Sequence, residues 1–492
     1  MMVTMVTGCA KDNPGTAQGA YKPGTYTATE QGHNGPVKVS VTFDANSITA
    51  VNIDEHSETP GVSDPAIERI PKSVVDGQTL AVDTVSGATV TSVAILNAVE
   101  DCVTQAGGDV TALKAAGEKT KDTADVTRDT EVLVVGTGIA GMLAAISAAD
   151  NGAQVLAIDK MPSTGGTSIT AGGYFIAADS QQPNDSNIDD SIDSLMTYWH
   201  SIMDEGSDTG YPNYDKVHSI LGDSGKTVDY MASFGVPFGS IINPFGGTPV
   251  AAVEGGGPGM ISALEKAARD KGVEFLLECK AEELIIDGSG AVTGVKATTP
   301  TENMTINAKS VVLATGGFSK NPEMVKSYSP EIEQVVPLAA VSSTGDGIRM
   351  AEAVGAARFE NYWSSLSGVT ISKDYAKAVP EASGLTTAQQ LGVNGKGERF
   401  ACEAGKHHTA LTYDLIKDGN YPHYFIFDSS SEELIAPMEA GIALDEVFKG
   451  DTIEQLADAI NVDAPTLKAT YDRYNELAKS GSDEDFGKAA DK

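Results

Sequence analysis

The sequence predicts an α/β protein in which a small α+β domain precedes a larger domain built on a parallel sheet. Between residues 24 and 53, short segments alternate apolar and polar residues and are separated by turn formers. Further on, two continuous apolar segments, Glu131–Val135 and Ser310–Ala314, are typical of buried parallel strands. A glycine-rich turn and an apolar helical pattern join the first of these to another strand, Val155–Ile158.

Composition excludes several classes of function. The 492 residues suffice for two or three domains. Lys and Arg total 34 against 68 Asp and Glu, a net charge of −34, which repels nucleic acid. None of the four cysteines forms a CxxC or CxxCH pair, so attached haem, iron–sulfur clusters and cysteine-held zinc have no support and no metal site is predicted. No apolar run approaches the roughly 20 residues that span a bilayer.

The first 20 residues are interpreted as the remnant of a lipoprotein signal followed by a tether. Val6–Cys9 resembles a bacterial lipobox, in which the cysteine becomes the lipidated first residue, and the polar segment Lys11–Gly19 follows it. We therefore expect an exported protein held at the membrane through Cys9, with the start of its signal missing from this chain. The alternative is a frayed terminus with a chance cysteine.

Residues 21–110 are predicted to form the small α+β domain, and the small, charged and polar residues 111–128 a linker. The strands of the small domain are expected at Gly24–Glu30, Val37–Phe43 and Ser47–Ile53, and its helices at Asp64–Val75 and Val90–Gln105.

A dinucleotide fingerprint opens the larger domain. Gly136, Gly138 and Gly141 follow a strand and open a helix, and Asp159 ends the next strand. The glycines permit a tight turn, backbone approach to a pyrophosphate and close packing of helix on strand, while the carboxylate suits a ribose diol. The helix N-terminus stabilises the phosphates. A Rossmann-like domain is predicted over 129–360, with further strands at Val273–Leu277, Ala281–Ile286 and Val292–Ala297 and a helix at Ile261–Lys271.

Repeated glycine turns indicate a long, flat ligand and favour FAD over NAD. These are Gly165-Gly166-Thr167-Ser168, Ala171-Gly172-Gly173, Gly256–Gly259, Ala314-Thr315-Gly316-Gly317-Phe318 and Thr344–Gly347. With these blocks in order, residues 129–487 resemble the fumarate reductase flavoprotein family, of the soluble flavocytochrome c type and its relatives that reduce urocanate or acrylates.

The resemblance implies non-covalent FAD held at the fingerprint and glycine blocks, with Asp346 near the flavin. We also assign three further residues to the FAD-binding set: Ala140, Lys160 and Ala281. It also implies an inserted α+β capping domain over 361–487 that carries the substrate. The family's C-terminal return to the FAD domain is expected to be missing from this chain.

A second motif, Asp83-Thr84-Val85-Ser86-Gly87-Ala88-Thr89, resembles the attachment signal of FMN-binding domains, where a flavin transferase joins FMN covalently to the final hydroxyl. The implied acceptor is Thr89, at the start of a helix where an anion is stabilised. Ser86, Gly87 and Ala88 leave room for the ligand. The loop His56–Gly61, with Glu58 and Thr59, resembles the second FMN loop of these domains. The alternative is a plain helix N-cap.

The reaction implied is hydride transfer from FAD to an activated C=C bond, with a proton added at the neighbouring carbon. Arg399 lies in a matching Gly397–Phe400 block, and His407 stands where the family has its acid arginine. The family's further cations are absent at Ser383–Thr386 and Leu366, so fumarate itself is not expected. Nearby aromatic residues suggest a bulkier substrate; these are Tyr362, Trp363 and Tyr375.

The sequence thus favours an anchored reductase that takes electrons from a membrane donor through FMN to FAD and then to a small unsaturated molecule. One alternative is an FAD-dependent 3-ketosteroid-type dehydrogenase. Another is a non-catalytic flavin electron carrier.

Overall fold

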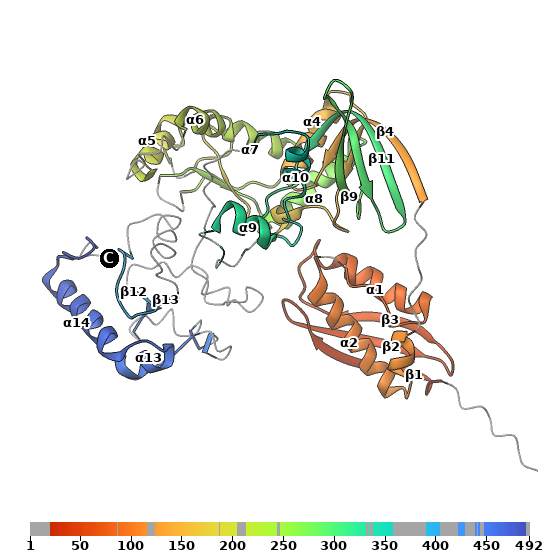
Figure 1. Cartoon of the computed structure of the whole chain (residues 1–492), viewed down its shortest axis with the longest axis horizontal. Coiled ribbons are helices and arrows are strands. Elements are labelled where there is room, and N and C mark those ends of the chain that lie inside the picture. Colours follow the sequence, from red (N-terminus) through yellow and green to blue (C-terminus); the bar gives the residue numbers. More distant parts are fainter. Residues whose placement is uncertain are drawn as a thin grey trace, which may run out of the picture.

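The computed structural model describes most of the chain in three groups of elements (Figure 1). The described residues are 20–85, 87–115, 124–185, 187–203, 213–243, 247–330, 333, 337, 339–357, 390–403, 422–428, 438–439, 441–442 and 447–488.

The N-terminal group is the predicted α+β domain. Its antiparallel sheet has the order β1-β2-β3, and two helices pack on one face of it (Figure 1). The strands are β1 (Gly24–Gln31), β2 (Pro36–Phe43) and β3 (Ile48–Glu55), and the helices are α1 (Asp64–Gly77) and α2 (Thr89–Gln105). Alternate residues of β2 are fully buried against α2, which is the period-2 pattern that predicted the strand. All five predicted elements are confirmed to within two residues at each end.

The predicted linker, residues 111–128, differs from the structure at both of its ends. A short helix, α3 (Val110–Ala115), enters it from one side. From the other side, β4 (Ala124–Val135) begins at residue 124 and pairs in parallel with β11 (Glu302–Leu313) along its whole length. The polar residues 124–130 form a strand because a full-length neighbour satisfies their backbone groups, a tertiary effect that outweighs composition.

A six-stranded sheet forms the centre of the larger domain, with the order β8-β5-β4-β11-β10-β9. The first four strands run parallel to one another. β10 pairs antiparallel with β11 on one side and with β9 on the other. The helix α4 (Ile139–Asp150) joins β4 to its neighbour β5 as predicted. The remaining strands are β5 (Val155–Ile158), β8 (Glu274–Leu276), β9 (Lys280–Ile286) and β10 (Val292–Thr298).

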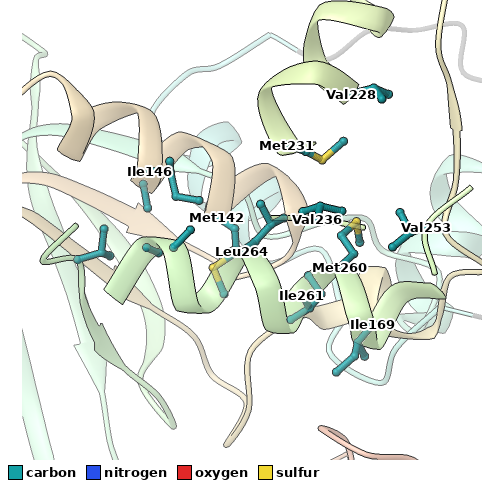
Figure 2. Packing of buried hydrophobic residues seen from close by; sticks show 14 of the residues in the cluster. Met142, Ile146, Ile169, Val228, Met231, Val236, Val253, Met260, Ile261 and Leu264 are labelled. Atoms are coloured by element: carbon teal, nitrogen blue, oxygen red, sulfur yellow. The ribbon is translucent and has the colours of Figure 1, made fainter. Parts of the chain in front are cut away.

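Hydrophobic clusters cover both faces of this sheet. On one face, α4 packs against α8 (Gly256–Asp270), with Met142, Ile146 and Leu264 between them (Figure 2). On the other face lie Leu133, Ile158 and Met350, the last from α10 (Asp346–Ala353). The smaller elements around these clusters are η1 (Gly166–Thr170), β6 (Tyr174–Ile176), α5 (Ile192–Met203), α6 (Tyr214–Gly222), α7 (Ser224–Ser233), β7 (Val250–Ala252) and α9 (Pro322–Tyr328).

The C-terminal group has a small core of its own, formed by residues such as Leu391, Val393 and Leu467. Its described elements are β12 (Leu391–Asn394), β13 (His423–Ile426), α13 (Ile453–Ile460) and α14 (Ala464–Ser480). Residues 361–389 lie outside the described residues, so the capping-domain boundary stays a prediction. Among the residues described, no helix combines the length and apolar character needed to cross a bilayer, and no three metal-ligating side chains gather at one place.

Candidate functional site

Two glycine turns meet where the central parallel strands end. Leu313 pairs with Val135, and the Ala314 N–H donates to the Val135 carbonyl at 2.8 Å. Gly136 has a φ of +100°, and a Cβ there would stand 2.4 Å from the Ala314 carbonyl oxygen. A side chain at residue 136 would therefore be both strained and blocked, so glycine is required for the two turns to lie together. The carboxyl edge of an open α/β sheet is where such folds bind ligands.

Asp159, which follows the end of β5, holds the fingerprint turn by hydrogen bonds. Its carboxylate is buried and accepts hydrogen bonds from the Thr137 N–H at 2.8 Å, the Thr137 hydroxyl at 2.7 Å and the Met161 N–H at 2.9 Å. An ionised carboxylate offers about four lone-pair positions, so about one remains for a ribose hydroxyl. The structure thus gives Asp159 a positioning role beside the predicted ligand-binding one.

The second glycine block lies directly against the fingerprint. The Gly165 N–H donates to the Thr137 carbonyl at 3.0 Å, and the Ser168 hydroxyl accepts from the Ile139 N–H at 3.2 Å. Thr167 reaches the other way, with its hydroxyl 3.1 Å from that of Ser343. Blocks that are far apart in the sequence are therefore assembled around one edge of the sheet.

Lys160 and Asp346 form an ion pair beside these turns. The Lys160 Nζ lies 2.5 Å from the Asp346 carboxylate and 2.5 Å from the Thr344 hydroxyl. Burial raises the pKa of the Asp346 carboxyl, but hydrogen bonds from Lys160 and Thr344 and the lysine charge outweigh burial and lower the pKa below its ordinary value. Asp346 is thus an ionised carboxylate at neutral pH, placed at the start of α10 where a negative charge is stabilised.

The glycine-lined edge has space for the dinucleotide that the sequence predicts. A Cβ on Gly138 would meet only ordinary contacts, at 3.6 Å from the Gly165 carbonyl and the Ser168 hydroxyl. Gly316 has no atom within 4 Å of such a position. Gly138, the N-cap residue of α4, has no side chain to cover the helix N-terminus, where the Ser168 hydroxyl accepts from the Ile139 N–H. Leu313 ends a central strand yet is exposed. These features fit a pyrophosphate on the helix and a flat apolar group beside it.

The other predicted FAD residues differ in exposure. The exposed ones lie at the same edge; they are Ala140, Thr167, Ala171, Gly172 and Gly316. Ala281 differs, because its side chain is buried in the cluster with Leu133 and Cys279 and is not open at this edge.

In the N-terminal domain, Glu58 joins the predicted FMN loop His56–Gly61 to the helix α2 that begins at Thr89. Its carboxylate is buried, accepts from the Asn34 N–H at 2.9 Å and is hydrogen-bonded by the Thr91 hydroxyl. Thr59 accepts from the Asn34 side chain at 2.8 Å. Glu58 therefore positions the loops from inside the protein. Sequence reasoning missed Asn34 and Thr91, although a buried hydroxyl two residues after Thr89 in an apolar helix was a usable signal.

Thr89 is exposed at the first position of α2, and its N-cap residue, Ala88, makes no side-chain capping hydrogen bond. The Ser92 hydroxyl holds the preceding turn by donating to the Ala88 carbonyl at 2.7 Å and accepting from the Val85 N–H at 3.0 Å. Val90 and Val93 lie beside Thr89 with exposed fractions of 47% and 42%. The site therefore offers a free hydroxyl, an anion-stabilising helix end and an apolar surface for a flavin ring. Ser86 lies outside the described residues.

Arg399 is buried within the C-terminal group. Its guanidinium pairs with Glu403 and Asp483, each at 2.8 Å, and stacks on the rings of Tyr474 and Phe486. Burial lowers the pKa of Arg399, but the hydrogen bonds and charges of the two carboxylates outweigh it and raise the pKa. These contacts are structural, so a catalytic role for Arg399 stays a prediction. His407 lies outside the described residues.

Replacing Arg399 by methionine is expected to destabilise the C-terminal group by about 3–5 kcal/mol, because the buried Glu403 carboxylate loses its close cation and keeps the Lys488 amine at 3.7 Å and the Gly392 N–H. Arg473 provides a matched control. It pairs with Asp485 at 2.8 Å on the surface, where water screens the charges, so Arg473→Met is expected to leave the urea midpoint almost unchanged. Urea unfolding of both variants measures the difference. Equal losses would contradict the structural role.

Known proteins match nearly the whole chain. Residues 131–492 match the model of the FAD binding domain, and residues 32–104 match that of the FMN-binding domain. The chain is 30% identical to urocanate reductase of Eggerthella lenta, over 98% of this chain and 82% of that protein. It is 27% identical to NADH:acrylate oxidoreductase of Vibrio harveyi, over 96% of this chain, and spans 53% of that protein's length. A flavocytochrome c3 fumarate reductase in its open conformation superposes with a TM-score of 0.57 and 27% identity, over 76% of this chain and 68% of that one.

Proposed function

The chain belongs to the FAD binding domain family of flavoproteins and carries an FMN-binding domain, and from this premise we propose that it reduces the C=C bond of a small unsaturated molecule. The relatives named for urocanate and acrylate support this reaction class. The single observation that carries the proposal is that the predicted FMN-attachment turn packs against the FAD-binding turns. A Cβ on Gly87 would stand 2.6 Å from the Met161 side chain, two residues after Asp159.

Bound FAD would supply a hydride to one carbon of the double bond. The chain's own residues do the rest. The turns at Gly136–Gly138 and Gly165–Ser168 hold the dinucleotide, and the ionised Asp346 is fixed by Lys160 at the same edge. We assign the proton that completes the reduction to His407, because an imidazole is a suitable general acid for this step.

The electrons enter, in this proposal, through FMN joined to Thr89 by a flavin transferase. A covalent phosphodiester keeps the flavin on a protein that works outside the cell. The exposed hydroxyl of Thr89, the N-terminus of α2 and the apolar Val90 and Val93 support this site.

Export and anchoring through Cys9, with a membrane electron donor, complete the proposal. The lipobox-like Val6–Cys9 segment supports it. The mass of the mature N-terminus of the full-length protein, with and without lipid, tests this part.

The reaction is tested with the flavin-loaded full-length protein under anaerobic conditions. The protein is reduced with dithionite and mixed with acrylate, urocanate or an aromatic enoate. We expect one of them to reoxidise the flavin while its double bond takes up two electrons and two protons, so that in heavy water deuterium appears at both of its carbons.

Two other outcomes would favour different functions. Failure of every enoate to reoxidise the protein would favour an electron carrier. Reduction of the oxidised protein by a saturated ketosteroid would favour a dehydrogenase.

A further inference from the structure

We infer that the FMN-binding domain docks on the FAD-binding turns themselves, and that the ion pair between Arg69 and Glu278 is the positioning contact that sets its orientation. Three separate elements of the N-terminal domain reach the larger domain. They are the loop at Gly61-Val62, the helix α1 through Arg69, and the turn at Gly87.

The loop contact is apolar. Val62 packs against the hydrophobic cluster that contains Ile169, a residue of η1 within the second glycine block. A Cβ on Gly61 would stand 2.7 Å from Ile169 Cδ1, so the backbone of the loop approaches this side chain closely. Figure 2 shows Ile169 at the lower rim of the cluster, on the side where a segment in the colour of the N-terminal domain passes.

The second contact involves the turn that precedes Thr89. Gly87 has a φ of +84°, and a Cβ there would meet the end of Met161 at 2.6 Å and Val341 at 4.0 Å. The left-handed backbone favours glycine at this position, while the contact is with the flexible end of the Met161 side chain. The attachment turn therefore lies between Met161, whose N–H donates to the Asp159 carboxylate, and the loop at residues 340–341. That loop in turn contacts the Thr167 hydroxyl.

The third contact is polar. Arg69 Nη1 lies 2.6 Å from the Glu278 carboxylate, with exposed side-chain fractions of 43% and 42%. Glu278 adopts a φ of +54°, and its N–H donates to the Met161 carbonyl at 3.0 Å. The backbone of Glu278 is therefore held next to Met161, the residue that lies against Gly87. An exposed pair contributes little to stability. Its effect is to select one docking orientation, as charges at the rim of an interface do.

These contacts place the flavin-attachment turn at one end of the FAD-binding edge. In its functional part the inference rests on the proposed electron path, because it states which surfaces bring the two flavins together. The docking itself does not depend on turnover, and it is tested separately.

Docking is tested by zero-length crosslinking of the full-length protein. In the Arg69→Lys variant, a carbodiimide is expected to join the introduced amine to the Glu278 carboxylate with loss of water, and peptide mass spectrometry identifies the link. The matched control is Arg69→Lys with Glu278→Gln, which removes the acceptor and is expected to lose the link. Lys72, one turn further along α1, serves as an internal control because it pairs with Asp76 within its own helix. Absence of the link from the single variant overturns the docking.

Orientation is tested by the rate of FAD reduction, which needs no unsaturated substrate. Full-length protein loaded with both flavins is mixed with reduced methyl viologen, two of which supply the two electrons that each FAD accepts. The FMN-dependent rate is the excess over the Thr89→Ala variant. We expect Arg69→Glu or Glu278→Arg to lower it by about fivefold or more at low salt, and the double charge swap to restore it.

Unchanged rates in both single variants would overturn the positioning role. A protein that forms the crosslink and shows the rate changes but reduces no enoate would leave the inference intact and overturn the proposed substrate class instead.

Discussion

Replacing Thr89 by alanine is expected to abolish covalent attachment of FMN. The phosphodiester needs a hydroxyl oxygen, and alanine has none. The substitution removes only an exposed side chain at the first position of α2, so the free energy of unfolding is expected to change by less than about 1 kcal/mol. Intact mass after co-expression with a flavin transferase measures the result as the gain or loss of one FMN.

Two variants control this experiment. Thr84 lies five residues earlier and is also exposed, so Thr84→Ala removes a comparable hydroxyl and is expected to keep the flavin. Thr89→Ser keeps a hydroxyl at the acceptor position and is expected to retain attachment. A flavin that persists in Thr89→Ala would move the acceptor elsewhere and would remove the proposed entry point for electrons.

Replacing Gly138 by valine is expected to lower FAD affinity by about a hundredfold or more, which corresponds to about 3 kcal/mol. The backbone at residue 138 has φ −67° and ψ −179°, which valine adopts without strain. Its Cβ would make only ordinary contacts with protein atoms, so the fold accommodates the substitution. The added methyl groups would instead stand over the N-terminus of α4, where the pyrophosphate is expected. FAD content after gel filtration measures the loss.

The control for Gly138→Val is Gly288→Val. Gly288 lies in the turn between β9 and β10 and has no atom within 4 Å of a Cβ position, but no cofactor is expected there. This variant is expected to keep its FAD. Both variants should still receive FMN on Thr89, which reports that the N-terminal domain has folded. Full FAD content in Gly138→Val would place the dinucleotide somewhere other than the fingerprint turn.

Local patterns were enough to predict the elements that pack by their own periodicity. The alternation in β2 and the helical spacing in α2 follow from burial of one face, so both were found to within two residues. The early start of β4 was missed because its polar first half is held by pairing with β11, a neighbour 178 residues further along the chain. Long-range pairing of this kind leaves no local signature.

The sequence by itself determined which residue types the two flavin sites contain. Its glycine turns, the acidic Asp159 and the Thr89 motif are local features, because a tight turn or a helix terminus is specified by adjacent residues. Tertiary structure alone decided how these parts meet. It turned the Glu58 carboxylate inward to Thr91, enclosed Arg399 between Glu403 and Asp483, and set the turn at Gly87 against Met161. Those contacts join residues far apart in the chain and depend on packing geometry, which no local pattern encodes.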